Sequence, residues 1–195
     1  MNKQAVIDFF DMLAPTWDEG LVHNDAIIGT ILDNANVREG CDVLDVACGT
    51  GVLVPDYLSR KVKSVTAVDI SPEMVRIARE KFQARGVDIR CADVEFWKPE
   101  KRFDCVVVYN AFPHFPDPEN LIAVLSGFLK PGGTLTVAHG KPRAAIDAHH
   151  SGRAAGVSMG LMHEDELAAI FEKHLRLTVK ISDDWMYQVA GVKTV

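Results

Sequence analysis

From Cys41 onward, the chain alternates short runs rich in β-branched residues with stretches whose apolar residues recur at helical spacing. This alternation is typical of βαβ units, in which helices pack on a largely parallel sheet. Two further runs near the end of the chain flank Ser182–Asp184 and predict an antiparallel hairpin at the sheet edge. The expected strands are Asp42–Ala47, Val65–Asp69, Val87–Cys91, Phe103–Tyr109, Thr134–Ala138, Leu175–Ile181 and Trp185–Val192.

The length of the chain, 195 residues, is that of one domain with a substantial core. Residues 1–40 carry apolar side chains at helical spacing and predict two cap helices before the sheet. Residues 41–138 form the predicted core. Residues 139–162 are rich in Gly, Ala, His and Met without a clear period, and a connection of that length is typical of a lid.

Charge and composition exclude several classes of protein. A formal net charge of −6 gives no overall positive field to hold a polyanion, which argues against a nucleic-acid partner. No apolar run approaches the length of a membrane span, and the N-terminus has no apolar signal region. The four cysteines lie singly in apolar surroundings, as expected of thiols in a reducing compartment. We therefore expect a cytoplasmic protein; its oligomeric state stays open.

A glycine turn, Cys48–Gly51, follows the first predicted strand. In an open parallel sheet, glycines at this turn let a ligand approach the backbone. Asp69 ends the second strand 20 residues after Gly49, where a carboxylate can accept hydrogen bonds from both hydroxyls of a ribose. Together these features predict a nucleoside site. Val54 stands where the dinucleotide motif requires a third glycine, which disfavours a pyrophosphate ligand.

Five segments follow one another in a distinctive order and spacing: VLDVACGTG, VTAVDISPEM, the acid of IRCADVEFW, FDCVVVYNAFPHFPDP and LKPGGTL. As a set, they resemble the class I S-adenosylmethionine-dependent methyltransferases. Residues 10–18 also resemble the opening of the ubiquinone/menaquinone-biosynthesis C-methyltransferases, which lies over the cofactor. The resemblance implies a Rossmann-like α/β three-layer sandwich, with a seven-stranded, mostly parallel sheet in the order 3-2-1-4-5-7-6 and a C-terminal antiparallel hairpin.

The resemblance also implies S-adenosylmethionine as cofactor and a small-molecule methyl acceptor. The backbone at Gly49 and Gly51 would pack against the methionine part, with Asp45 near its amino group, and Asp69 would hold the ribose. The remaining implied cofactor contacts are Asp93 on the adenine amino group, Ile70, Met74, Ala92 and Val94 around the adenine, Asn110 beside the sulfonium, and Trp17 in the N-terminal cover.

Two positions depart from the wider family pattern. Ala47 stands where many members have their first glycine, and Tyr109-Asn110 is not the signature of enzymes that methylate nucleic-acid amino groups. Two alternatives from other classes remain: a nicotinamide-dependent oxidoreductase, against which the glycine spacing argues, and a non-catalytic cofactor-binding module.

Histidines gather in the second half of the chain, at positions 114, 139, 149, 150 and 163. Imidazole titrates near neutral pH and is a common metal ligand, but this spacing fits no standard metal motif. Most of these histidines are expected to be ordinary surface or lid residues. His114, after the fourth strand, is the best candidate for a general base, with Asn110 as a second candidate in the catalytic region; no metal is expected.

Overall fold

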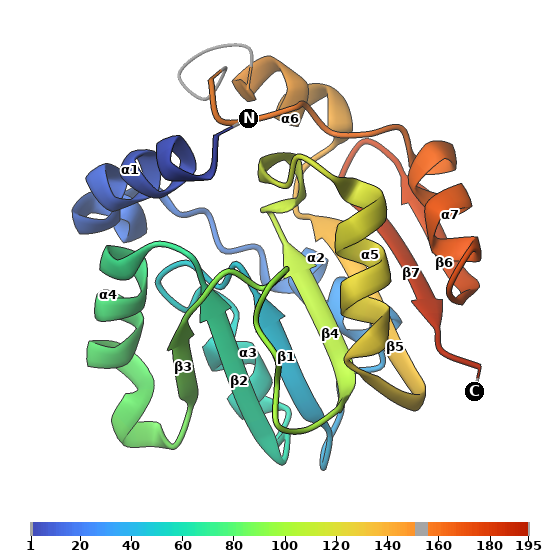
Figure 1. Ribbon diagram of the computed structural model, residues 1–195, viewed down its shortest axis with the longest axis horizontal. Coiled ribbons are helices and arrows are strands. Elements are labelled where there is room, and N and C mark those ends of the chain that lie inside the picture. Colours follow the sequence, from blue (N-terminus) through green and yellow to red (C-terminus); the bar gives the residue numbers. More distant parts are fainter. Residues whose placement is uncertain (1, 151–155, 195) are drawn as a thin grey trace.

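The protein is described by a computed structural model over residues 2–150 and 156–194, with the side chains of 148–150 outside the description. Its centre is one seven-stranded sheet in the order β3-β2-β1-β4-β5-β7-β6 (Figure 1), which confirms the predicted order. The first five strands run parallel, and β7 pairs antiparallel with both β5 and β6. The strands are β1 Asp42–Val46, β2 Ser64–Asp69, β3 Asp88–Cys91, β4 Phe103–Tyr109, β5 Leu129–His139, β6 Arg176–Ser182 and β7 Tyr187–Val192.

Helices begin where the sequence supplies caps. Ser71 accepts a hydrogen bond from the Met74 amide at the start of α4, and Asp117 accepts one from the Asn120 amide at the start of α5. The α-helices are α1 Lys3–Leu13, α2 Asp25–Asn34, α3 Val54–Ser59, α4 Pro72–Phe82, α5 Pro118–Gly127, α6 Arg143–His150 and α7 Glu164–Glu172. Three short 3₁₀ segments are η1 Ala14–Gly20, η2 Gln83–Arg85 and η3 Phe112–His114.

Two apolar cores cover the faces of the sheet. Helices α5 and α7 bury Leu121, Ile122 and Phe171 on one face, while α2, α3 and α4 pack on the other. Strand β4 is central and contributes Val106 to the first core and Val107 to the second, as alternation along a covered strand requires. Within the described residues, no helix has the length and apolarity needed to cross a membrane.

Six of the seven strands differ from the predicted bounds at one end or both, and the differences in β1, β5 and β7 have clear local causes. Strand β1 ends at Val46 because Ala47 adopts a positive φ of 54°. Strand β5 begins at Leu129 and contains the predicted Pro-Gly-Gly turn as an irregularity in its pairing with β4, which Gly132 permits with a φ of +77°. Strand β7 begins at Tyr187, since Asp183 accepts hydrogen bonds from the Trp185 and Met186 amides and extends the hairpin turn.

The segment 139–162 is not the wholly aperiodic connection that its composition indicates. Residues 143–150 form the helix α6, whose Arg-Ala-Ala-Ile-Asp-Ala sequence contains good helix formers. The short length of this helix and the glycines on both sides hide its period. Residues 151–155, including Gly152, lie outside the described part of the chain.

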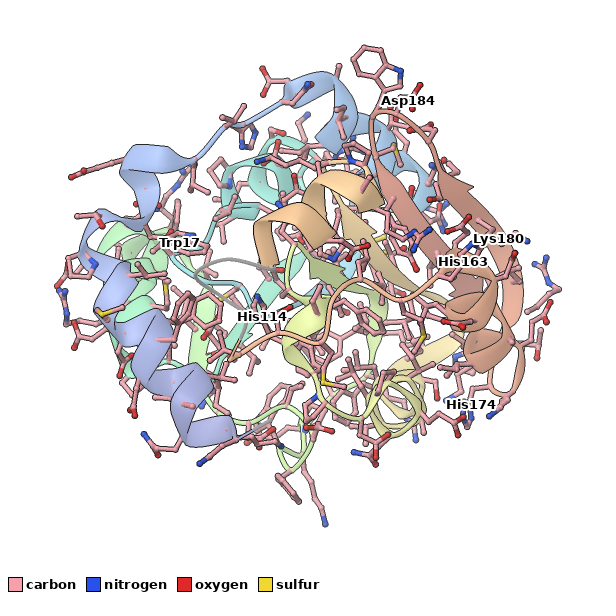
Figure 2. All side chains as sticks on the ribbon, turned by 90° about the horizontal axis from the view of Figure 1, so that it is seen from above. Trp17, His114, His163, His174, Lys180 and Asp184 are labelled. Carbon is pink, nitrogen blue, oxygen red and sulfur yellow. The ribbon has the colours of Figure 1, made fainter. Side chains whose placement is uncertain are left out.

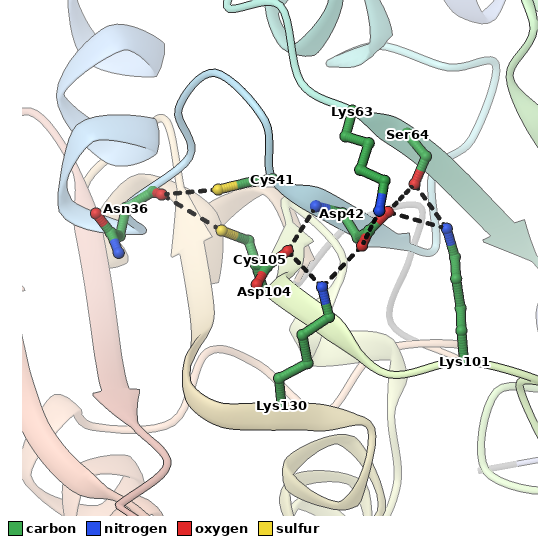
Figure 3. Close-up of polar contacts among 9 residues, drawn as sticks. All are labelled: Asn36, Cys41, Asp42, Lys63, Ser64, Lys101, Asp104, Cys105 and Lys130. Atoms are coloured by element: carbon green, nitrogen blue, oxygen red, sulfur yellow. Dashed lines mark hydrogen bonds and ion pairs between the residues drawn. The ribbon is translucent and has the colours of Figure 1, made fainter.

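At the amino ends of the strands, a cluster of charged side chains is paired within itself (Figure 3). Asp42 accepts hydrogen bonds from Lys130 at 2.7 Å and from Ser64, and Lys101 and Lys63 also face it. Desolvation raises the pKa of Asp42, but its hydrogen bonds to Lys130 and Ser64 and the charge of Lys101 outweigh this and hold that pKa well below its usual range. This cluster is structural, because each charge has a partner.

Candidate active site

The carboxyl ends of the parallel strands carry the candidate site. In Figure 1, α1 and α6 cross above this edge of the sheet. A cavity lies beneath, and its lining includes every predicted site residue except Gly51. The lining comprises Lys3, Val6, Phe10, Trp17, Leu21, Asp45, Ala47, Cys48, Gly49, Val52, Leu53, Val68, Asp69, Ile70, Met74, Ala92, Asp93, Val94, Glu95, Tyr109, Asn110, Ala111, His114, Phe115 and Pro116.

The turn after β1 brings its backbone to the cavity wall. Ala47 and Gly49 both adopt positive φ angles, 54° and 55°. A Cβ added at Gly49 would lie 3.7 Å from Nε1 of Trp17 and 4.0 Å from Sδ of Met74, two other lining side chains. The bare backbone of Gly49 therefore faces the cavity, which is the close approach that a ligand at this turn requires.

Asp69 connects this turn to the start of α4. Its Oδ2 accepts a hydrogen bond from the Gly49 amide at 2.8 Å, and its Oδ1 accepts one from the Ser71 amide at 2.9 Å. Burial raises the pKa of Asp69, and these amide hydrogen bonds oppose that rise. Because each carboxylate oxygen can accept more than one hydrogen bond, Asp69 keeps acceptor capacity toward the cavity.

Asp45 is a buried acid on β1, and no described lysine, arginine or histidine forms an ion pair with it. Burial, together with the nearby charge of Asp69, raises the pKa of Asp45 to about 8. The Asp45 carboxyl is therefore mostly protonated at neutral pH, and a cationic ligand group beside it would favour its ionised form. A buried acid of this kind at a cavity wall is typical of a ligand site.

The raised pKa of Asp45 predicts a pH-dependent stability. Between about pH 4, where this acid ionises in the unfolded chain, and pH 8, the folded protein holds the proton and the unfolded chain does not. The free energy of unfolding therefore falls as pH rises through this interval, by at most about 1.4 kcal/mol per pH unit from this group.

We expect Asp45→Asn, which does not titrate, to gain thermal stability relative to the unmodified protein as pH rises from 5 to 8. Thermal unfolding of both proteins across this range measures the difference. A difference that stays constant with pH would contradict the raised pKa.

Gly51 has a different role from Gly49. Its φ is +84°, and an added Cβ would lie 2.7 Å from the Phe82 ring. Gly51 thus permits close packing of the turn against α4, and it lies outside the cavity lining. Both glycines were predicted to contact the ligand, and the spacing alone did not separate packing from ligand approach.

One end of the cavity lies between β2, β3 and α4. Ile70, Met74, Ala92 and Val94 give it apolar walls, and Met74 is 1% exposed. Asp93 stands at this end, where its Oδ2 accepts a hydrogen bond from Lys3 at 2.6 Å. Lys3 also pairs with Glu95 at 2.7 Å, so the start of α1 is tied to this end of the cavity by charge.

Aromatic rings from α1, η1 and η3 form the roof of the cavity. The Phe10 ring lies 5.6 Å from the Trp17 ring and 4.9 Å from the His114 ring, both in edge-to-face geometry. In Figure 2, Trp17 lies toward the left of the view and His114 lies nearer the centre. Asp18 holds η1 in place through Thr50 Oγ1 at 2.6 Å and Lys81 Nζ at 2.9 Å.

The segment after β4 places the two predicted catalytic candidates. Asn110 adopts a positive φ of 54°, and its Oδ1 accepts a hydrogen bond from the Gly140 amide at 3.0 Å. His114 Nδ1 lies 2.7 Å from the Val157 carbonyl oxygen. A carbonyl oxygen only accepts, so Nδ1 carries the proton, and the neutral ring has its lone pair on Nε2.

None of the other histidines whose side chains are described lines the cavity with His114. His139 is buried on β5, and His163 caps α7 by accepting a hydrogen bond from the Asp165 amide. Figure 2 shows His163 and His174 on the far side of the molecule from Trp17. The side chains of His149 and His150 lie outside the described residues. Within the described part of the chain, no group of His, Cys, Asp or Glu side chains could hold a metal ion.

Sequence reasoning missed several lining residues, among them Lys3, Val6, Leu21 and Glu95. Residues 3, 6 and 10 lie on one face of α1. Their helical spacing could have predicted which face of this helix closes the cavity. No sequence pattern identified the pairing of Lys3 with Asp93, which depends on how α1 packs across the sheet.

An open parallel sheet, a glycine turn after its first strand and an acid at the end of its second define the Rossmann-like nucleoside-binding class. Residues 43–133 match the family described as Methyltransferase domain. This match covers 91 of the 195 residues and agrees with the resemblance of the sequence motifs to the class I S-adenosylmethionine-dependent methyltransferases.

A curated relative is the ubiquinone biosynthesis O-methyltransferase of Xanthomonas axonopodis pv. citri (strain 306), 40% identical over 100 residues. That match covers 49% of this chain and 41% of the relative, so the matched region spans less than half of the relative's length.

Solved structures share the fold. A putative methyltransferase of Haloferax volcanii, solved in complex with the Trm112 methyltransferase activator, has a TM-score of 0.79 at 20% identity, over 95% of this chain and 98% of that one. Magnesium protoporphyrin IX methyltransferase from Synechocystis PCC 6803, solved with bound S-adenosylhomocysteine, has a TM-score of 0.72 at 17% identity, over 98% and 99%.

Proposed function

We propose that the protein transfers the methyl group of S-adenosylmethionine to a small-molecule acceptor. One observation carries this proposal: a single cavity contains the bare backbone of Gly49, the buried acid Asp69 and an aromatic roof that reaches His114. The domain match and the bound S-adenosylhomocysteine of the Synechocystis neighbour support it. The nicotinamide alternative lacks support from these comparisons.

The residues present fit the cofactor. Asp69 would accept hydrogen bonds from the ribose hydroxyls, and Gly49 would give the methionine part room beside the turn. Asp45 would ionise beside the ligand's amino group. The adenine would be enclosed by Ile70, Met74, Ala92 and Val94. Asp93 would accept a hydrogen bond from the adenine amino group while it also accepts one from Lys3.

The bound cofactor supplies a methyl group on a sulfonium, which is already activated for transfer. The chain's task is to align the acceptor with that methyl and to exclude water, and orientation of this kind can contribute roughly 7–11 kcal/mol. Asn110 stands at the end of β4, next to the reacting centre implied by this placement. The aromatic rings of Phe10 and Trp17 would favour the positive charge of the sulfonium.

His114 is the proposed general base. Its Nδ1–H donates to the Val157 carbonyl oxygen, which fixes the tautomer whose Nε2 can accept a proton. Oxygen, nitrogen, sulfur and activated carbon acceptors that must lose a proton would all use such a base. The O-methyltransferase relative favours oxygen.

We also propose that the chain forms one domain in which residues 1–40 and 139–162 cover the site. Val6 of α1 packs against Val157, and the Met159 amide donates to the Pro113 carbonyl beside His114. The four cysteines are free thiols, which supports the cytoplasm as its location. The negative net charge argues against a nucleic-acid substrate.

The direct test is calorimetry with S-adenosylhomocysteine and, in parallel, with NAD. We expect heat of binding with the first ligand and none with the second. Hydrogen exchange of the same complex should show protection at residues 3–18 and 156–162, together with 45–49 and 69–74. A folded protein that binds NAD, or neither ligand, would contradict the proposal. Protection confined to the turn and α4 would show that the N-terminal segment and residues 156–162 do not cover the site.

A further inference from the structure

The acceptor end of the cavity, beyond the glycine turn, is built from apolar and aromatic side chains. They come from the N-terminal segment, from the two residues before α3 and from the segment after β4: Phe10, Trp17, Leu21, Val52, Leu53, Ala111, Phe115 and Pro116. Tyr109, Asn110 and His114 add the polar groups of this end. Such a wall favours a ligand with a flat apolar body and one polar group.

Charged side chains line only the opposite part of the cavity. Among the described lining residues, Lys3 is the one lysine or arginine, and it already pairs with Asp93 and Glu95. Asp45 and Asp69 are buried acids. No described lysine or arginine side chain therefore lines the acceptor end, and a carboxylate moved there from water would lose its hydration without a cationic partner.

Two exposed apolar side chains lie next to this end. Val22, which follows the lining residue Leu21, is 81% exposed, and Met159, whose amide contacts Pro113, is 66% exposed. An apolar molecule would thus meet apolar side chains before it enters the cavity.

We infer that the acceptor is an uncharged aromatic molecule with an ionisable O–H or S–H group, and that the cavity discriminates against carboxylate-bearing analogues. This inference rests on the proposed methyl transfer. The acceptor's O–H or S–H bond breaks and its proton goes to Nε2 of His114. The acceptor oxygen or sulfur bonds to the methyl carbon as the bond from that carbon to the sulfonium sulfur breaks. The electron pair of the broken bond stays on sulfur, leaving a neutral thioether.

Two isosteric probes isolate charge: 4-hydroxybenzamide, which is neutral, and 4-hydroxybenzoate, which carries a carboxylate. Calorimetric titration of each into the protein saturated with S-adenosylhomocysteine measures acceptor binding without requiring turnover. We expect the amide to bind at least ten-fold more tightly. Equal binding, tighter binding of the carboxylate, or no binding of either probe would overturn the inference. The preceding titration with S-adenosylhomocysteine tests the proposed function separately.

A matched pair of variants locates the selectivity. Leu21 lines the cavity and is 38% exposed, so Leu21→Arg can place a guanidinium at the acceptor end without burying it completely. We expect this variant to tighten 4-hydroxybenzoate binding at least ten-fold. Val22→Arg adds the same charge one residue away, outside the lining, and should leave the ratio of the two probes unchanged. An equal response of both variants would show a general charge effect and overturn the inference.

Discussion

Replacement of Asp69 by alanine is expected to weaken binding of S-adenosylhomocysteine by ten-fold or more. Hydrogen bonds to a charged acceptor contribute roughly 1.5–3 kcal/mol each, and about 1.4 kcal/mol corresponds to a factor of ten in affinity. Two ribose hydroxyls would lose their acceptor. Calorimetry on the variant, after circular dichroism has shown that it folds, measures the loss.

Asp69 also accepts hydrogen bonds from the Gly49 and Ser71 amides. Its removal can therefore disorder the turn as well as weaken ligand binding directly. Changing the ligand separates these effects. Adenosine should bind the unmodified protein more tightly than 2′-deoxyadenosine or 3′-deoxyadenosine does, and in Asp69→Ala this preference should disappear. A preference that survives in the variant would assign the ribose to another residue, even if overall affinity falls.

The sequence was informative where a residue's role depends on its neighbours along the chain. The parallel sheet follows from βαβ alternation, and the positions of Gly49 and Asp69 at the cavity follow from where strands end, whereas the strand order and the place of Asp45 were implied by the family resemblance. The starts of α4 and α5 were predictable because Ser71 and Asp117 are caps followed directly by proline.

Roles that depend on packing between distant segments were not predictable. Gly51 resembles Gly49 in sequence, but the Phe82 ring lies against it, 31 residues further on. Likewise, Lys3 reaches Asp93 only because α1 lies across the carboxyl ends of the strands. The Val157 carbonyl that fixes the tautomer of His114 belongs to a segment with no sequence signal for that contact.

Strand β1 shows how the same residue type takes opposite roles at its two ends. Asp42, at the amino end, has Lys130, Lys101 and Lys63 as partners, and its pKa is well below the usual range. Asp45, three residues later, faces the cavity and another acid, and its pKa is raised to about 8. The first acid therefore stabilises the fold, whereas the second lowers stability near neutral pH and is available to a ligand cation.

Gly49→Ala is expected to reduce affinity for S-adenosylhomocysteine by at least about 100-fold, because the new methyl group would project into the space between Trp17 and Met74. No protein atom lies nearer than 3.7 Å to that Cβ, so the variant should fold, at a cost of about 1 kcal/mol for an alanine with positive φ.

Two other glycines provide the controls for this variant. Gly40 has a φ of +83° with nothing within 4 Å of its Cβ position, so Gly40→Ala carries the same backbone strain and should bind normally. Gly51→Ala should instead lose stability, since its Cβ would lie 2.7 Å from Phe82. If Gly49→Ala binds as tightly as Gly40→Ala does, the ligand does not approach this turn, and the nucleoside site must lie elsewhere in the cavity.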